Sequence, residues 1–84
     1  MGLLGTGLQA ASMFGFSDRR LKKNIRKVGT MHKGKVNVYE FEYLGSDKRE
    51  IGVMAQEVKK MYPDAVKKHE SGYLMVNYSK LLGV

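Results

Sequence analysis

The sequence predicts an α+β fold, a small antiparallel sheet with one main helix, preceded by an apolar N-terminal arm. Within residues 36–43, aromatic side chains alternate with glutamates from Tyr39 to Tyr43, which is the two-residue period of a strand. Residues 55–62 instead space their apolar side chains at the period of a helix. Residues 1–16 contain no charged side chain, unlike the remainder of the 84-residue chain. We therefore expect an arm over 1–16 and a domain over 17–84.

The strand over 36–43 has one aromatic face, and we expect that face to be buried. The face consists of Tyr39, Phe41 and Tyr43. A turn over 44–50 and a short apolar strand over 51–54 follow, so the two strands are expected to pair antiparallel. The segment before them is ambiguous, because Leu21 and Ile25 fit the spacing of a helix and equally fit a strand with a bend.

The helix over 55–62 is expected to bury Met54, Val58 and Met61, and Pro63 should end it. Two further strands, over 65–69 and 73–78, flank a hairpin turn at Glu70, Ser71 and Gly72. The second of these strands is expected to present three residues to the core: Leu74, Val76 and Tyr78. Ser79 then caps a short C-terminal helix.

Composition excludes several classes of site. The chain has no cysteine and two histidines, which is too few ligands for a zinc site, and no cofactor is predicted. Its net charge of +7 points to an acidic partner or to phosphate. A basic patch is expected at Arg19, Arg20, Lys23, Arg26 and Lys27. Without a recognition helix or a stacking platform, contact with nucleic acid is the less favoured alternative.

Ser17 and Lys22 are the candidate catalytic residues, because a lysine with a lowered pKa can act as general base to a serine nucleophile. The plainer alternative is a capping serine before a solvated basic face. Asp18, Gln56 and Glu57 are candidate supports of this site, the last two at the predicted junction of strand and helix.

Five sequence blocks then carry a family resemblance. They are SDRRLKKNIR (17–26), FEY (41–43), IGVMAQEV (51–58), PDAV (63–66) and VNYSKLL (76–82). In this order they resemble the intramolecular chaperone auto-processing domain, or peptidase S74 domain, found at the C-terminus of many bacteriophage tail fibres and endosialidase tailspikes. A relative occurs in the myelin regulatory factors. The resemblance covers residues 17 to about 82.

The resemblance implies that the domain assists trimerisation of a preceding fibre and then cuts itself off, with Ser17 as nucleophile and Lys22 as base. Two features differ from the family: sixteen residues precede Ser17, and the chain stops at Val84 where a long coiled-coil helix usually follows. An exposed Lys22 stays protonated, and burial or cations such as Arg19 and Lys23 would be needed to lower its pKa. Lacking the coiled coil that would pack subunits together, the pair is expected to be mostly silent as a catalyst.

The arm is expected to be an interaction segment. Its large apolar residues are Leu3, Leu4, Leu8, Phe14 and Phe16. Sixteen residues fall short of the roughly 20 that a membrane-spanning helix needs. Lasting exposure of these side chains costs about 25 cal/mol per Å², so the arm should bury itself against another virion protein, a copy of this chain or a host membrane.

Three functions remain in competition. The first is a structural and assembly protein of a phage particle, associated with the tail or tail fibre, that uses the chaperone-type fold to oligomerise as a trimer or as ring-associated copies and to bind other virion proteins. The second is an active self-cleaving serine peptidase. The third is a basic minor virion protein that contacts the genome or is ejected with it. In each case the protein is made in the host cytoplasm and resides in the virion.

Overall fold

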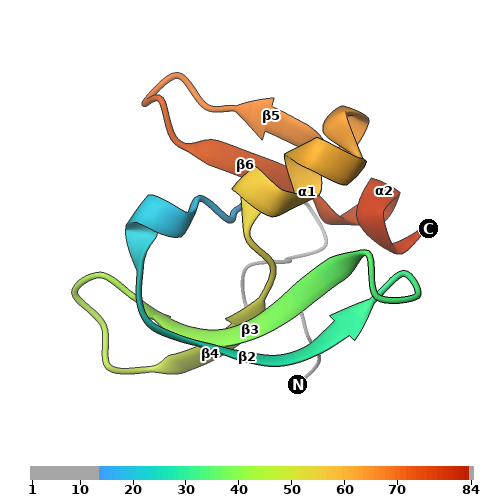
Figure 1. The fold of residues 1–84 in the computed structure, drawn as a ribbon. Helices are drawn as coiled ribbons and strands as arrows, with labels where there is room; N and C mark the ends of the chain where they lie inside the picture. Colours follow the sequence, from blue (N-terminus) through green and yellow to red (C-terminus); the bar gives the residue numbers. More distant parts are fainter. Residues whose placement is uncertain (1–13, 84) are drawn as a thin grey trace.

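The computed structural model describes residues 14–83. Their strands form two antiparallel three-stranded sheets, in the orders β1-β6-β5 and β2-β3-β4. In Figure 1 the two sheets lie on opposite sides of the molecule, and helix α1, Ala55–Met61, packs beside β5 and β6. The α+β class with one main helix is therefore confirmed, although the strands divide into two sheets.

The larger sheet consists of β2 (Lys22–Met31), β3 (Val36–Tyr43) and β4 (Arg49–Gly52). The residues left ambiguous between helix and strand belong to β2, so the bent strand is correct and the helix is wrong. The register of β2 against β3 shifts between Lys23 and Arg26 and again between Lys27 and Gly29. These bulges break the two-residue period, which is why the apolar spacing resembled that of a helix.

Strand β3 confirms the predicted aromatic face most clearly at Phe41, which is 2% exposed. Its neighbours Tyr39 and Tyr43 are only half-buried, because each hydroxyl reaches a polar partner. On the opposite face, Glu40 and Glu42 form ion pairs with basic side chains of β2 and β4. The predicted antiparallel pairing of β3 with β4 is also confirmed.

Helix α1 buries Ala55 and Val58 as its inner face. The prediction that Met61 would be buried is wrong, because its side chain is 47% exposed. The chain leaves the helix at Tyr62, before the 3-10 turn η3 (Pro63–Ala65), and Tyr62 packs against the core.

The smaller sheet joins β1 (Phe14–Phe16), β6 (Leu74–Asn77) and β5 (Val66–Lys68). Strand β1 pairs antiparallel with β6, so the last three residues of the predicted arm belong to the folded sheet. Leu3, Leu4 and Leu8 lie outside the described residues.

The inward side of β6 follows the prediction: Val76 and Tyr78 are buried, and Leu74 packs against the same core. The C-terminal helix α2 spans Tyr78–Leu82. Its cap is Asn77, whose side chain accepts from the Lys80 amide, and Ser79 already lies inside the helix. Ser79 was therefore the wrong cap, because the helix begins before it.

Candidate functional site

Asp18 anchors the turn that leads from β1 into β2. It precedes the 3-10 turn η2 (Arg19–Leu21), and its fully buried carboxylate accepts five hydrogen bonds. Three come from Arg20, through the backbone amide (2.9 Å), Nε (3.0 Å) and Nη2 (2.8 Å). The others come from Gln56 Nε2 (2.8 Å) and the Leu74 amide (2.9 Å). The hydrogen bond from the Arg20 side chain is the main reason why the pKa of Asp18 lies well below its usual range.

The predicted supports Gln56 and Glu57 point to different partners. Gln56 donates to Asp18 and accepts from the Arg19 amide at 2.9 Å, so it ties the start of α1 to η2. Glu57 accepts from the Tyr39 hydroxyl at 2.6 Å and from Asn37 Nδ2 at 3.3 Å. Gln56 therefore lies beside the Ser17 segment, whereas the hydrogen bonds of Glu57 run to β3.

Ser17 is fully buried and held through each of its polar groups. Its hydroxyl lies 2.5 Å from the Tyr78 hydroxyl. Its amide donates to the Leu74 carbonyl at 3.2 Å, and its carbonyl accepts from the Ala55 amide at 2.7 Å and from Lys22 Nζ at 3.2 Å. Ser17 thus links the smaller sheet to the start of α1 and to the first residue of β2.

Lys22 is buried, with 6% of its surface exposed, although it begins an otherwise basic strand. Nζ donates to the Val53 carbonyl at 2.6 Å and to the Ser17 carbonyl, and it lies 4.3 Å from the centre of the Phe41 ring. Burial lowers the pKa of Lys22 to about 7, and the charges of Asp18 and Glu57 only partly oppose this.

Lys22 is therefore not in the exposed setting in which it would stay protonated. Burial within a single chain lowers its pKa, so no packing of subunits is required for this effect. Neighbouring cations such as Arg19 and Lys23 are not the cause; the charges that act on Lys22 belong to Asp18 and Glu57, and these raise its pKa.

Within residues 14–83 no hydrogen bond joins the Ser17 hydroxyl directly to Lys22 Nζ. The hydroxyl is paired with Tyr78, and the amine is paired with two backbone carbonyls, one of them that of Ser17 itself. The two predicted catalytic side chains thus lie at the same segment, but a proton could pass from the Ser17 hydroxyl to Lys22 Nζ only after both side chains change partner.

Two tyrosines of the site were not singled out from the sequence. Tyr78 holds the Ser17 hydroxyl, and burial raises its pKa. Tyr43 donates its hydroxyl to the Phe16 carbonyl at 2.9 Å, and burial raises its pKa to about 12. Each tyrosine lies in one of the five blocks that carry the family resemblance, which was the available signal.

The predicted basic patch is partly neutralised. Arg20 pairs with Asp18, Lys23 lies 3.9 Å from Glu42, and Arg26 pairs with Glu40 at 2.8 Å. Arg19 and Lys27 are exposed. The five cations thus do not present one unpaired surface.

Of the apolar arm residues, Phe16 is described in most detail. Its side chain is 37% exposed and meets the His69 ring edge-on, at 5.0 Å between centroids. The backbone of Phe14 pairs with Asn77. Over the described part of the chain, no cluster of three potential metal-binding side chains occurs, and no helix is long and apolar enough to cross a membrane.

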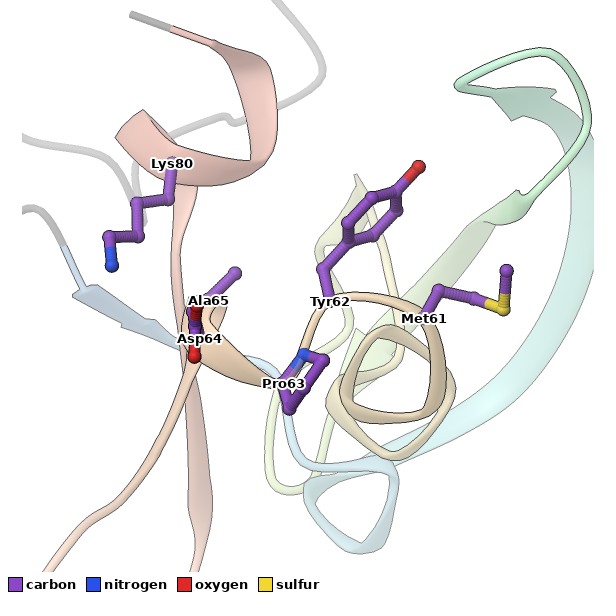
Figure 2. A pocket seen from close by; sticks show the side chains of 6 residues that line it. All are labelled: Met61, Tyr62, Pro63, Asp64, Ala65 and Lys80. Carbon is purple, nitrogen blue, oxygen red and sulfur yellow. The ribbon is translucent and has the colours of Figure 1, made fainter.

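A shallow hollow lies elsewhere on the surface, where α1, η3 and α2 meet (Figure 2). Its lining residues are Met61, Tyr62, Pro63, Asp64, Ala65 and Lys80. None of these contacts Ser17 or Lys22 through a hydrogen bond, so the hollow is separate from the buried site.

Comparison with known families gives a match over most of the domain. The family model for peptidase S74, described as the chaperone of endosialidase, matches residues 17–67. The chain belongs to the peptidase S74 family. This family of chaperone domains is found in phage tail fibres and endosialidases, which is consistent with a structural role in a phage. No curated protein and no solved structure matches the chain.

Proposed function

We propose that this S74 domain is an assembly module of a phage tail or tail fibre, which binds copies of itself and other virion proteins. The observation that carries this proposal is strand β1. Its residues Phe14, Gly15 and Phe16 pair with Asn77, Val76 and Met75 of β6, so the segment that leads into Ser17 is held in register by the domain.

Strand β1 is also an edge of its sheet, since β6 is its only neighbour among the described residues. An edge strand offers unpaired backbone groups to another chain. A second copy or a partner strand can add at this edge, and the arm over 1–13 precedes it directly. We infer that this edge and the arm that precedes it in the sequence both serve assembly.

Two deletions test this function. Removal of residues 1–13 leaves β1 intact, whereas removal of 1–16 takes β1 as well. We expect the full chain to oligomerise and to enter particles, the shorter deletion to give a soluble domain that enters them poorly, and the longer deletion to lose assembly entirely. Light scattering and the protein content of purified particles measure both effects. Normal incorporation of both truncated chains contradicts the proposal.

A second candidate function, self-cleavage beside Ser17, is favoured by the environment of Lys22. A lysine whose pKa is about 7 is neutral in about half of the molecules at neutral pH and can then accept the serine proton. Its Nζ already contacts the Ser17 carbonyl. A silent pair was expected because the chain lacks the coiled coil that would pack subunits around Lys22, but Lys22 is already buried within one chain.

Intact mass of the purified chain tests this activity over several days between pH 6 and pH 9. We expect fragments that result from a cut beside Ser17, in larger amounts above pH 7 because Lys22 loses its proton there. Ser17→Ala and Lys22→Met should stay intact, and Lys27→Met on the exposed side of β2 should behave like the unmodified chain. An uncut chain at every pH excludes this second function and leaves the assembly function unaffected.

A further inference from the structure

The carbonyl group before Ser17 has a side-chain donor of its own. The hydroxyl of Tyr43, at the end of β3, donates to the Phe16 carbonyl oxygen at 2.9 Å. The two residues lie 27 positions apart and in different sheets, so this contact depends on the complete fold. It directs a hydroxyl donor at one of the two peptide bonds that flank Ser17.

We propose that Tyr43 is a catalytic residue of self-cleavage, whose hydroxyl stabilises the negative charge that develops on the Phe16 carbonyl oxygen when Ser17 attacks the Phe16–Ser17 bond. The inference rests on the second candidate function above. Donors that are fixed in place before the reaction, and aimed at the oxygen where charge develops, are a major source of catalysis in acyl transfer.

The reaction balances without any group beyond this chain and water. Once the Ser17 hydroxyl has left Tyr78 and Lys22 Nζ has left its carbonyl partners, Lys22 takes the hydroxyl proton, and Oγ forms a bond to the Phe16 carbonyl carbon. The carbon–nitrogen bond between Phe16 and Ser17 then breaks, and the nitrogen receives the proton from Lys22. This leaves an ester between Phe16 and the Ser17 side chain. Water hydrolyses the ester to a Phe16 carboxylate and the restored Ser17 hydroxyl.

Ring size distinguishes the two peptide bonds beside Ser17. Attack of Oγ on the preceding carbonyl passes through a five-membered ring, whereas attack on the carbonyl of Ser17 itself requires a strained four-membered ring. The Ser17 carbonyl has two donors, the Ala55 amide and Lys22 Nζ. Because Oγ cannot usefully attack the Ser17 carbonyl, the two donors to that carbonyl serve to hold Ser17 in position. Tyr43 instead polarises the Phe16 carbonyl, which is the one that reacts.

Tyr43 also remains a donor over the pH range in which Lys22 becomes a base. Burial raises the pKa of Tyr43 to about 12 and lowers that of Lys22 to about 7. Between these values the lysine is mostly neutral and the tyrosine still carries its proton. The rate of cleavage should therefore rise through pH 7 and stay level up to about pH 11.

The test compares Tyr43→Phe with Tyr62→Phe, which removes a hydroxyl at the hollow beside α1. Cleavage is followed by intact mass at pH 8, and thermal melts establish that each variant folds. Because Tyr43 is half-buried, we expect Tyr43→Phe to slow cleavage by about 100-fold, the low end of the range for loss of one oxyanion donor. Tyr62→Phe should cleave at the unmodified rate.

A second measurement on the unmodified chain does not depend on how the variants fold. The new N-terminus should be Ser17, and hydroxylamine should capture the ester as a Phe16 hydroxamate. A new N-terminus at Asp18, or a folded Tyr43→Phe chain that cleaves at full rate, overturns the role of Tyr43 and leaves self-cleavage standing. An uncut unmodified chain overturns self-cleavage and this inference together.

Discussion

Asp18 and Lys22 lie four positions apart and are both buried. Their surroundings nevertheless have opposite effects on the charged form of the side chain. The Asp18 carboxylate accepts five hydrogen bonds, including a two-point contact with the Arg20 guanidinium. The Lys22 ammonium has two backbone carbonyls and the face of Phe41, and within residues 14–83 it forms no ion pair. The fold therefore stabilises the charged form of Asp18 and the neutral form of Lys22.

This difference suggests a structural role for Asp18 and a chemical role for Lys22. A buried carboxylate whose oxygens are fully hydrogen-bonded fixes the positions of its partners, here η2, the start of α1 and the start of β6. A buried amine without a carboxylate partner destabilises the protein while it is protonated, but it is ready to accept a proton at neutral pH. We therefore expect Asp18 to determine stability and Lys22 to determine reactivity.

The largest effect is expected at Asp18. Asp18→Ala leaves the Leu74 amide and Gln56 without their acceptor and should lower the free energy of unfolding by about 3 to 5 kcal/mol. That is a large part of the roughly 5 to 10 kcal/mol such a domain has. Urea unfolding measures the change. Asp47→Ala is the matched control and should have almost no effect, because the Asp47 side chain is fully exposed and lies 4.0 Å from its partner Lys23.

The lowered pKa of Asp18 predicts that the protein loses stability in acid. The folded pKa of Asp18 lies below its unfolded value, so its contribution is complete above the ordinary carboxyl pKa and is lost as the pH falls through and below that value. In the Asp18→Ala variant this loss should be absent, which unfolding curves between pH 2 and pH 6 can measure. Equal acid sensitivity in both proteins would show that other carboxylates dominate.

Phe41 tests the environment of Lys22, because its ring lies against the Lys22 amine. Phe41→Ala should cost about 3 to 5 kcal/mol through loss of core packing. It should also admit water and move the pKa of Lys22 back toward 10.5. Glu42→Ala, on the opposite face of β3, should cost less. Similar losses of stability from the two substitutions, measured by urea unfolding, would mean that the orientation of β3 is wrong.

Lys22→Met is expected to change how stability depends on pH. Lys22 binds a proton more weakly in the folded chain, so the unmodified protein should gain stability as the pH rises from about 7 toward 10.5. The gain is on the order of 3 to 4 kcal/mol. Lys22→Met should remove most of this slope, as unfolding curves at pH 6, 8 and 10 can establish, and an unchanged slope would assign it to other groups.

How far the sequence predicted this molecule depends on the kind of interaction. Strand β3 and helix α1 followed from local periodicity, because one face of each packs on the core. The division into two sheets, the bulges of β2 and the exposure of Met61 depend on contacts between distant segments. The burial of Lys22 has the same origin, because Val53 and Phe41, which enclose it, lie far from it in the sequence.

The site residues, too, could be predicted only where the signal was local in the sequence. Ser17 and Lys22 could be singled out because they are close in sequence and occur in a recognisable block. Tyr43 could not, because its relevance arises only where the end of β3 meets the residue that precedes Ser17. A tyrosine in an aromatic strand looks like any core residue until its hydroxyl partner is known.

The most direct test of this account is the pKa of Lys22 in the full chain. Lysine labelled with ¹³C at Cε allows each ammonium group to be titrated by NMR, and the Lys22→Met spectrum assigns the signal of interest. We predict a midpoint near pH 7 for Lys22. A Lys22 midpoint near 10.5 would show that water reaches the amine, and would contradict the claim that this fold prepares Lys22 to act as a base.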